Sequence, residues 1–283
     1  MVREQIMVDF GNILTLTQKE IRDARSNRWF ILFAVAFAGL ALALAWLALS
    51  GVGTYGLAGF GRTGASLINL VLLIIPLMGL TLGALSLSGE RERGTLLYLL
   101  TQPVSQAEVL LGKFFGLAVA ILAALVLGFG LSGLLIAWQG GVTQATDFLG
   151  LVLLAFALAL VSLSLGFLIS SAVSKSATAI GLALFLWLVL VFFGDLGLMG
   201  TAIVLRLGVG ELFTMALLNP LQLFKMAAIL AIRGNLEVLG PAGIYALRTY
   251  GAQLMPMLLA ILLGWTILPL GATYLILRRR GVL

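Results

Sequence analysis

The 283-residue chain contains no cysteine and no histidine. Without cysteine it has neither a disulfide nor a thiolate metal site. Without histidine it lacks the usual metal ligand and the side chain that most often acts as a general base near neutral pH. We therefore expect that this chain binds no metal or other cofactor of its own and is not itself an enzyme.

Charge is also scarce, because only 10% of the residues are charged and 61% are hydrophobic. Soluble domains carry about 25% charged residues. This composition predicts an all-α integral membrane protein of one domain, residues 1–283. The 17 basic residues outnumber the 11 acidic ones, but in a membrane protein their location matters more than their sum, so we do not expect nucleic-acid binding.

Six apolar runs are long enough to supply the roughly 20 helical residues that cross a bilayer. They cover about 29–50, 65–88, 107–138, 148–172, 177–194 and 254–277. The first run follows 28 polar or amphipathic residues and is too long for a signal-peptide core, so we expect it to remain as an anchor. No run carries an ionisable residue near its centre, which disfavours a proton-coupled carrier and a membrane enzyme.

The basic residues predict the orientation of the chain. With both termini inside, twelve of them fall in cytoplasmic segments and five in outer segments. Cytoplasmic loops are enriched in lysine and arginine, so this division favours cytoplasmic termini. The twelve are Arg3, Lys19, Arg22, Arg25, Arg28, Arg91, Arg93, Lys113, Lys175, Arg278, Arg279 and Arg280, and the five are Arg62, Arg206, Lys225, Arg233 and Arg248.

Two segments outside the six runs are predicted to be helical. Residues 1–28 have apolar side chains at helical intervals and charges near Trp29, as in an interfacial helix. Residues 200–253 are expected to form short helices at the outer surface, one of them starting at Asn219 and Pro220. These helices either cover the outer mouth or bind an external partner, for which the candidate residues are Asn219, Pro220, Gln222, Phe224, Lys225 and Arg233.

Several short motifs have a simpler explanation than ligand binding. GVGTYG, residues 51–56, matches a dinucleotide-binding pattern but follows a membrane run rather than a strand, so it is interpreted as a loop. No complete phosphate-binding loop occurs anywhere in the chain. GLTLG, residues 79–83, and GKFFG, residues 112–116, have the spacing that lets helices pack closely. Met255 and Met257 could offer sulfur to copper, but packing is the better interpretation without histidine or cysteine beside them.

Four consecutive charges stand out in this weakly charged chain. Residues 90–93 read ERER and are followed by four leucines before Pro103. A short helix whose leucines enter a groove of a soluble partner, with the charges at its rim, accounts for both features. A helix lying on lipid is the alternative. The candidate interface, within a cytoplasmic coupling segment at 89–104, comprises Glu90, Arg91, Glu92, Arg93, Gly94, Leu96, Leu97, Leu99 and Leu100.

The string GERERGTLLYLLTQPVSQAEVLLGKF resembles the intracellular coupling segment of ABC-2 type exporter permeases, which have six transmembrane helices per subunit. NPLQLFKMAAIL, residues 219–230, is similar to the NosY branch, the membrane subunits of nitrous oxide reductase maturation systems. The resemblance implies a bacterial inner-membrane homodimer with two cytoplasmic ATPase subunits, which hold ATP and magnesium. It further implies a periplasmic β-helical partner of the NosD type and copper handling by the whole system.

Since this chain lacks histidine and cysteine, we expect it to transmit ATP-driven motion rather than conduct copper. Two alternatives remain open from the sequence. One is an ABC exporter of a lipid, peptide or drug, and the other is a stand-alone channel or carrier without an ATPase.

Overall fold

The computed structural model describes residues 9–50, 58–95, 104–140, 145–197, 200, 207–233, 236 and 240–280, and within these ranges every regular element is a helix. GVGTYG lies outside them. The helices are α1 (Phe10–Ser26), α2 (Arg28–Ser50), α3 (Ala58–Glu92), α5 (Gln106–Gly140), α6 (Ala145–Ala172), α7 (Ser176–Phe192), α9 (Val209–Leu217), α10 (Pro220–Arg233), α11 (Pro241–Tyr250) and α12 (Leu254–Arg280).

Five apolar helical stretches are long enough to cross a membrane, and the all-α membrane fold is confirmed. They are Arg28–Leu47, Ala65–Glu92, Gln106–Leu135, Leu149–Ala172 and Pro241–Arg279. The remaining predicted run, 177–194, corresponds to α7, whose 17 residues make a helix of about 26 Å. That length is at the lower limit for a span. A π-helical turn, Phe193–Gly197, continues it.

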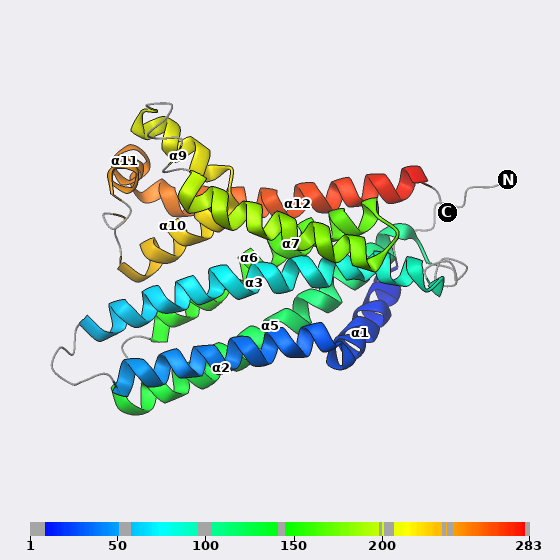
Figure 1. The fold of residues 1–283 in the computed structure, drawn as a ribbon, viewed down its shortest axis with the longest axis horizontal. Coiled ribbons are helices and arrows are strands. Elements are labelled where there is room, and N and C mark those ends of the chain that lie inside the picture. The colour runs from blue at the N-terminus through cyan, green and yellow to red at the C-terminus, as the bar shows by residue number, and fades with distance from the viewer. Residues whose placement is uncertain are drawn as a thin grey trace.

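The helices form an elongated bundle with two distinct ends (Figure 1). One end holds α1, the last turn of α3, the start of α5, the turn between α6 and α7, and the last turn of α12. The opposite end holds α9 and α11. The two ends of the described chain therefore lie at the same end of the bundle (Figure 1).

The N-terminal segment forms a helix separate from the first span. Asn27 separates α1 from α2, and its Oδ1 accepts a hydrogen bond of 2.9 Å from the backbone N–H of Trp29. Ile13, Leu16 and Ala24 lie on the buried face of α1. That face packs along α5, as an amphipathic lead-in to the membrane should.

The outer helices include one that packs into the bundle. Asn219 Oδ1 accepts a 2.9 Å hydrogen bond from Leu221 N, and Pro220 is the first residue of α10, so the predicted helix start is confirmed. α9 and α10 meet at an angle of 107°. α10 contacts α6, α12 and α3, and its Leu223 and Ala227 are fully buried. It is therefore packed more deeply than a helix that lies on the outer surface.

Glycines allow close contact between α3 and α6. A Cβ atom at Gly79 would lie 2.8 Å from Ser162 Cβ, and one at Gly83 would lie 2.5 Å from the carbonyl oxygen of Leu163. On the facing helix, a Cβ at Gly166 would lie 2.8 Å from Gly83 Cα. The packing interpretation of GLTLG is therefore confirmed.

The second glycine pair, on α5, lets α1 pack closely against that helix. A Cβ atom at Gly112 would lie 2.5 Å from Leu16 Cβ, and one at Gly116 would lie 2.5 Å from Glu20 Cβ. The GKFFG motif of α5 thus packs within the chain, as predicted, and it brings α1 close enough for Glu20 to reach the interior.

Replacing Gly83 with alanine should destabilise the protein by about 1–3 kcal/mol, because the new methyl group would overlap backbone atoms of α6 that cannot rotate away. Gly130→Ala on α5 is the matched control, since no atom lies within 4 Å of its Cβ position. Alanine in a helix interior is favoured over glycine by roughly 0.5–1 kcal/mol. Thermal unfolding of the two purified variants in detergent would measure both stability changes. Equal stability of the two variants would contradict the close contact.

Candidate functional site

The last turn of α3 carries the consecutive charges, and each of the first three has a partner elsewhere in the chain. Glu90 faces inward and is 7% exposed. The Arg91 guanidinium donates a 2.9 Å hydrogen bond to the carbonyl oxygen of Val173, in the turn between α6 and α7. Glu92 Oε2 accepts a 2.9 Å hydrogen bond from the backbone N–H of Ser176. The end of α3 is thus attached to several other elements by charged side chains.

The Glu92 contact explains how α7 begins. Lys175, the residue before the helix, makes no side-chain cap. The first N–H groups of a helix lack intrahelical partners and carry partial positive charge, so a carboxylate placed there is favourable. Glu92 supplies that carboxylate from α3. Arg93 is exposed and lies beside a cavity described below.

Glu90 and four other charged side chains, from three helices in all, form a network of ion pairs. We call this group the ion cluster: Lys19, Glu20, Asp23, Glu90 and Lys113. Lys113 Nζ on α5 lies 2.6 Å from Glu20 Oε1 on α1 and 2.7 Å from Glu90 Oε1 on α3. The Lys113 side chain is 2% exposed and the two carboxylate side chains are 9% exposed. One enclosed ammonium therefore bonds carboxylates of two other helices.

Lys19 adds a second ammonium on the more exposed side of the ion cluster. Its Nζ lies 3.0 Å from Glu90 Oε1, 3.3 Å from Glu20 Oε1 and 3.4 Å from Asp23 Oδ2. Burial alone would lower the pKa of Lys19, but the Glu20 and Glu90 carboxylates outweigh it and raise that pKa above its usual value. The positive charge of Lys19 therefore contributes stability that is fully present below the ordinary lysine pKa and is lost as pH rises through the raised pKa.

A cavity of about 510 Å³ lies beside the ion cluster, between α1, α3 and α5. Its wall combines charged side chains with apolar and small polar ones, namely Glu20, Asp23, Ala24, Ser26, Asn27, Leu82, Leu85, Ser86, Glu90, Arg93, Lys113 and Leu117. On this side α3 is held by long charged side chains rather than by the close backbone contact that it makes with α6.

The start of α5 is held to the start of α1 by a second group. Ser105 and Glu108 form a capping box, in which Glu108 N donates to Ser105 Oγ at 3.2 Å and Ser105 N donates to Glu108 Oε2 at 2.8 Å. Glu108 is fully buried. Its Oε1 also accepts a 2.6 Å hydrogen bond from the backbone N–H of Asp9. Glu108 therefore joins α5 to α1 by hydrogen bonds.

The chain matches the family model described as "ABC-2 family transporter protein" over residues 14–282. The chain is a member of the ABC-2 transporter family. It is 31% identical over 291 residues to a Stutzerimonas stutzeri protein named "Probable ABC transporter permease protein NosY", covering 95% of this chain and 99% of the relative. A Pseudomonas aeruginosa protein of the same name is 34% identical over 223 residues, covering 76% of this chain and 80% of that protein.

The predicted ATPase interface of this ABC-2 permease is only partly described. Glu90, Arg91 and Glu92 have the intramolecular contacts given above, whereas Arg93 and Gly94 are exposed. Gly94 has a φ of 73°, a left-handed conformation that glycine adopts without strain. Leu96, Leu97, Leu99 and Leu100 lie outside the described residues. Their docking role stays a prediction.

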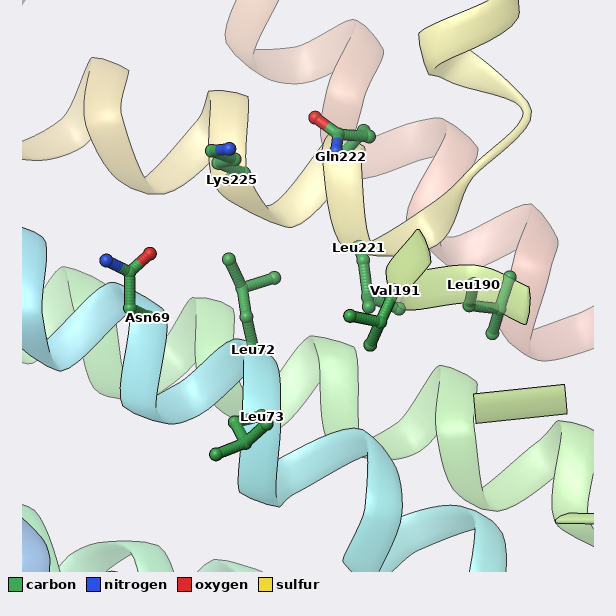
Figure 2. Close-up of a pocket in the computed structure, with 8 residues that line it drawn as sticks. All are labelled: Asn69, Leu72, Leu73, Leu190, Val191, Leu221, Gln222 and Lys225. Carbon is green, nitrogen blue, oxygen red and sulfur yellow. The ribbon is translucent and has the colours of Figure 1, made fainter. Parts of the chain in front are cut away.

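The predicted outer interface is divided between buried and accessible side chains. Phe224 is fully buried and Asn219 is 7% exposed, with Nδ2 donating 2.7 Å to the carbonyl oxygen of Leu190. Gln222 and Lys225 line a cavity of about 170 Å³ between α3, α7 and α10 (Figure 2), together with Asn69, Leu72, Leu73, Leu190, Val191 and Leu221. Arg233 ends α10, and its side chain is not among those described. A partner at this surface stays a prediction.

The described residues contain no group of three or more histidine, cysteine, aspartate and glutamate side chains able to hold a metal ion. Met255 and Met257 pack against the hydrophobic core, which agrees with the packing interpretation of these two methionines.

Sequence reasoning missed the ion cluster. Lys113 was assigned only to the cytoplasmic side of its apolar run, and Glu20 only to the interfacial helix. One signal could have found the pairing, because a lysine two turns inside an apolar helix needs a partner of opposite charge. The sequence alone could not say which acidic residue would be near it.

Lys113→Met should destabilise the permease by about 3–5 kcal/mol, because it leaves the Glu20 and Glu90 carboxylates buried without the ammonium between them. Lys175→Met removes an exposed lysine and should change stability by no more than about 0.5 kcal/mol. Unfolding of both variants in detergent, monitored by circular dichroism, checks the difference. A Lys113→Met protein as stable as Lys175→Met would rule out a buried ion cluster.

Proposed function

We propose that this ABC-2 permease couples ATP hydrolysis on a separate cytoplasmic ATPase to movement across or outside the membrane. The observation that carries the proposal is the anchoring of the last turn of α3. Directly before residues 96–103, Glu90, Arg91 and Glu92 contact α1, α5, the turn between α6 and α7, and the start of α7. A force applied to the coupling segment would therefore reach four parts of the bundle.

The proposed assembly contains two copies of this chain and two ATPase subunits that hold ATP and magnesium. The similarity to permeases named NosY over most of the chain supports a role in copper delivery for nitrous oxide reductase, with a NosD-like protein outside. In this proposal the permease transmits motion and holds no copper. Its location is the bacterial inner membrane with both termini in the cytoplasm, which agrees with the twelve-to-five division of basic residues.

Reporter fusions test the orientation. Fusions after Gln106 and Lys175 should report the cytoplasm, and fusions after Gly61, Gln144 and Gly234 should report the periplasm, because basic residues concentrate in cytoplasmic segments. A periplasmic signal from the Gln106 fusion would remove the basis for an ATPase contact at residues 89–104.

Leu97→Asp and Leu100→Asp test the docking helix. Each would place a carboxylate in a desolvated groove of the ATPase, where an unpaired charge costs several kcal/mol. We expect co-purification of the ATPase and ATP-driven activity to fall sharply. Arg93→Ala removes an exposed charge and should cost only about 0–1 kcal/mol of binding.

The amount of permease in the membrane is measured for every variant, since misfolding would imitate loss of coupling. If both aspartate variants bind the ATPase normally and retain full activity, the segment is not the docking helix.

A further inference from the structure

The α1 helix contacts α5 and α3 in two very different ways, and the ion cluster lies where these two contacts meet. α1 packs along α5 and hardly touches α3 directly. Between α1 and α3, the ammonium groups of Lys19 and Lys113 each bond Glu20 and Glu90, and the cavity of about 510 Å³ occupies the neighbouring space. Polar bonds through these two lysines therefore connect α1 with the end of α3.

From this arrangement we infer that Lys113 is a positioning residue that makes α1 move together with the end of α3 when the coupling segment is displaced. The inference rests on the proposed function and deepens it by adding the interfacial helix to the moving unit. Lys113 is enclosed, and its carboxylate partners come from two other helices, α1 and α3. Ion pairs in low dielectric are strong and break only at high cost once both partners are buried.

Glu108 provides the comparison that separates this role from ordinary anchoring of α1. It is also buried on α5 and also bonds the N-terminal part of α1, through Asp9 N and Asn12 Nδ2. Among the described residues, none of its hydrogen bonds reaches α3. A variant at Glu108 therefore perturbs the start of α5 and its contact with α1. Removal of the Glu90 carboxylate instead takes away the α3 partner of both Lys19 and Lys113 and cuts the ionic connection between α1 and α3.

The test uses a neutral variant that keeps the fold. Glu20→Gln, Glu90→Gln and Lys113→Met are combined, so that no buried charge of this group is left unpaired, and replacing a whole buried ion network is often neutral for stability. Glu108→Gln is the matched control and keeps an acceptor oxygen. Unfolding midpoints of all proteins are measured first. If the neutral variant does not fold, Glu90→Gln alone takes its place, since it removes the carboxylate that Lys19 and Lys113 share on α3 while Lys113 stays paired with Glu20.

Spin labels on paired cysteines then report the motion, which is convenient because the chain has no cysteine of its own. One pair joins Arg22 on α1 to Thr95 beyond α3, and the other joins Arg22 to Arg278 at the end of α12; all three positions are exposed. Labelled chains are mixed with excess unlabelled chains and assembled with the ATPase. Distances are measured without nucleotide and with a non-hydrolysable ATP analogue.

In the native complex, the Arg22–Arg278 distance should shift by about 1–2 Å on nucleotide binding, the size of helix shifts at interfaces, while the Arg22–Thr95 distance stays constant. The Glu108→Gln complex should behave in the same way. In the neutral variant the Arg22–Arg278 shift should disappear and the Arg22–Thr95 distribution should change with nucleotide, although the ATPase still binds.

A neutral variant that keeps the native Arg22–Arg278 shift would overturn the inference. So would a native complex in which ATP hydrolysis drives the activity of the permease while α1 does not move relative to α12. Failure of this inference can be distinguished from failure of the proposed function. If the native chain forms no complex with an ATPase, the proposed function itself is wrong.

Discussion

A buried ammonium needs paired carboxylates, and this requirement organises the end of the bundle where the helices α1, α3 and α5 meet. Lys113 is two turns inside an apolar helix, where an unpaired charge would be very costly. Glu20 and Glu90 satisfy it from two different helices at 2.6 and 2.7 Å. For Glu20 to reach that position, α1 must pack closely on α5, and the glycines of the GKFFG motif make this contact possible. The interfacial helix is therefore part of the packed structure.

The α3 helix has two kinds of neighbour along its length. In the middle of the bundle it meets α6 through glycines that leave no space for a side chain. At its last turn it is attached by charged and polar contacts to α1, α5 and the start of α7. The glycine contact fixes the helix as a rigid rod within the core, because protein interiors are close-packed and transmit strain. The polar contacts join the last turn of α3 to its neighbours through long side chains, and the buried ion pairs among them are costly to break.

The apolar runs, the glycine motifs and the helix start at Asn219 could be predicted because each depends on local sequence, and the structure bears them out. The run predicted at 177–194 matches α7 and the π-helical turn that continues it to Gly197, whereas α10 lies deeper than expected, since its burial depends on α6 and α12 rather than on its own composition. The charges at 90–92 were interpreted as rim contacts with a partner, which stays a prediction, and within the chain they bond Lys113, Val173 and Ser176. Those partners lie 23 to 84 residues away in sequence, so no local pattern could identify them.

The central claim is that Lys113 and Glu90 bond each other inside the permease, and a double-mutant cycle on Lys113→Met and Glu90→Gln tests it most directly. Stability of the native chain, both single variants and the double variant is measured under identical detergent conditions. The account predicts that the double variant loses less stability than the sum of the single variants, with a coupling energy of roughly 1–3 kcal/mol, as for residues in one buried network. Additive losses, with a coupling energy near zero, would contradict it.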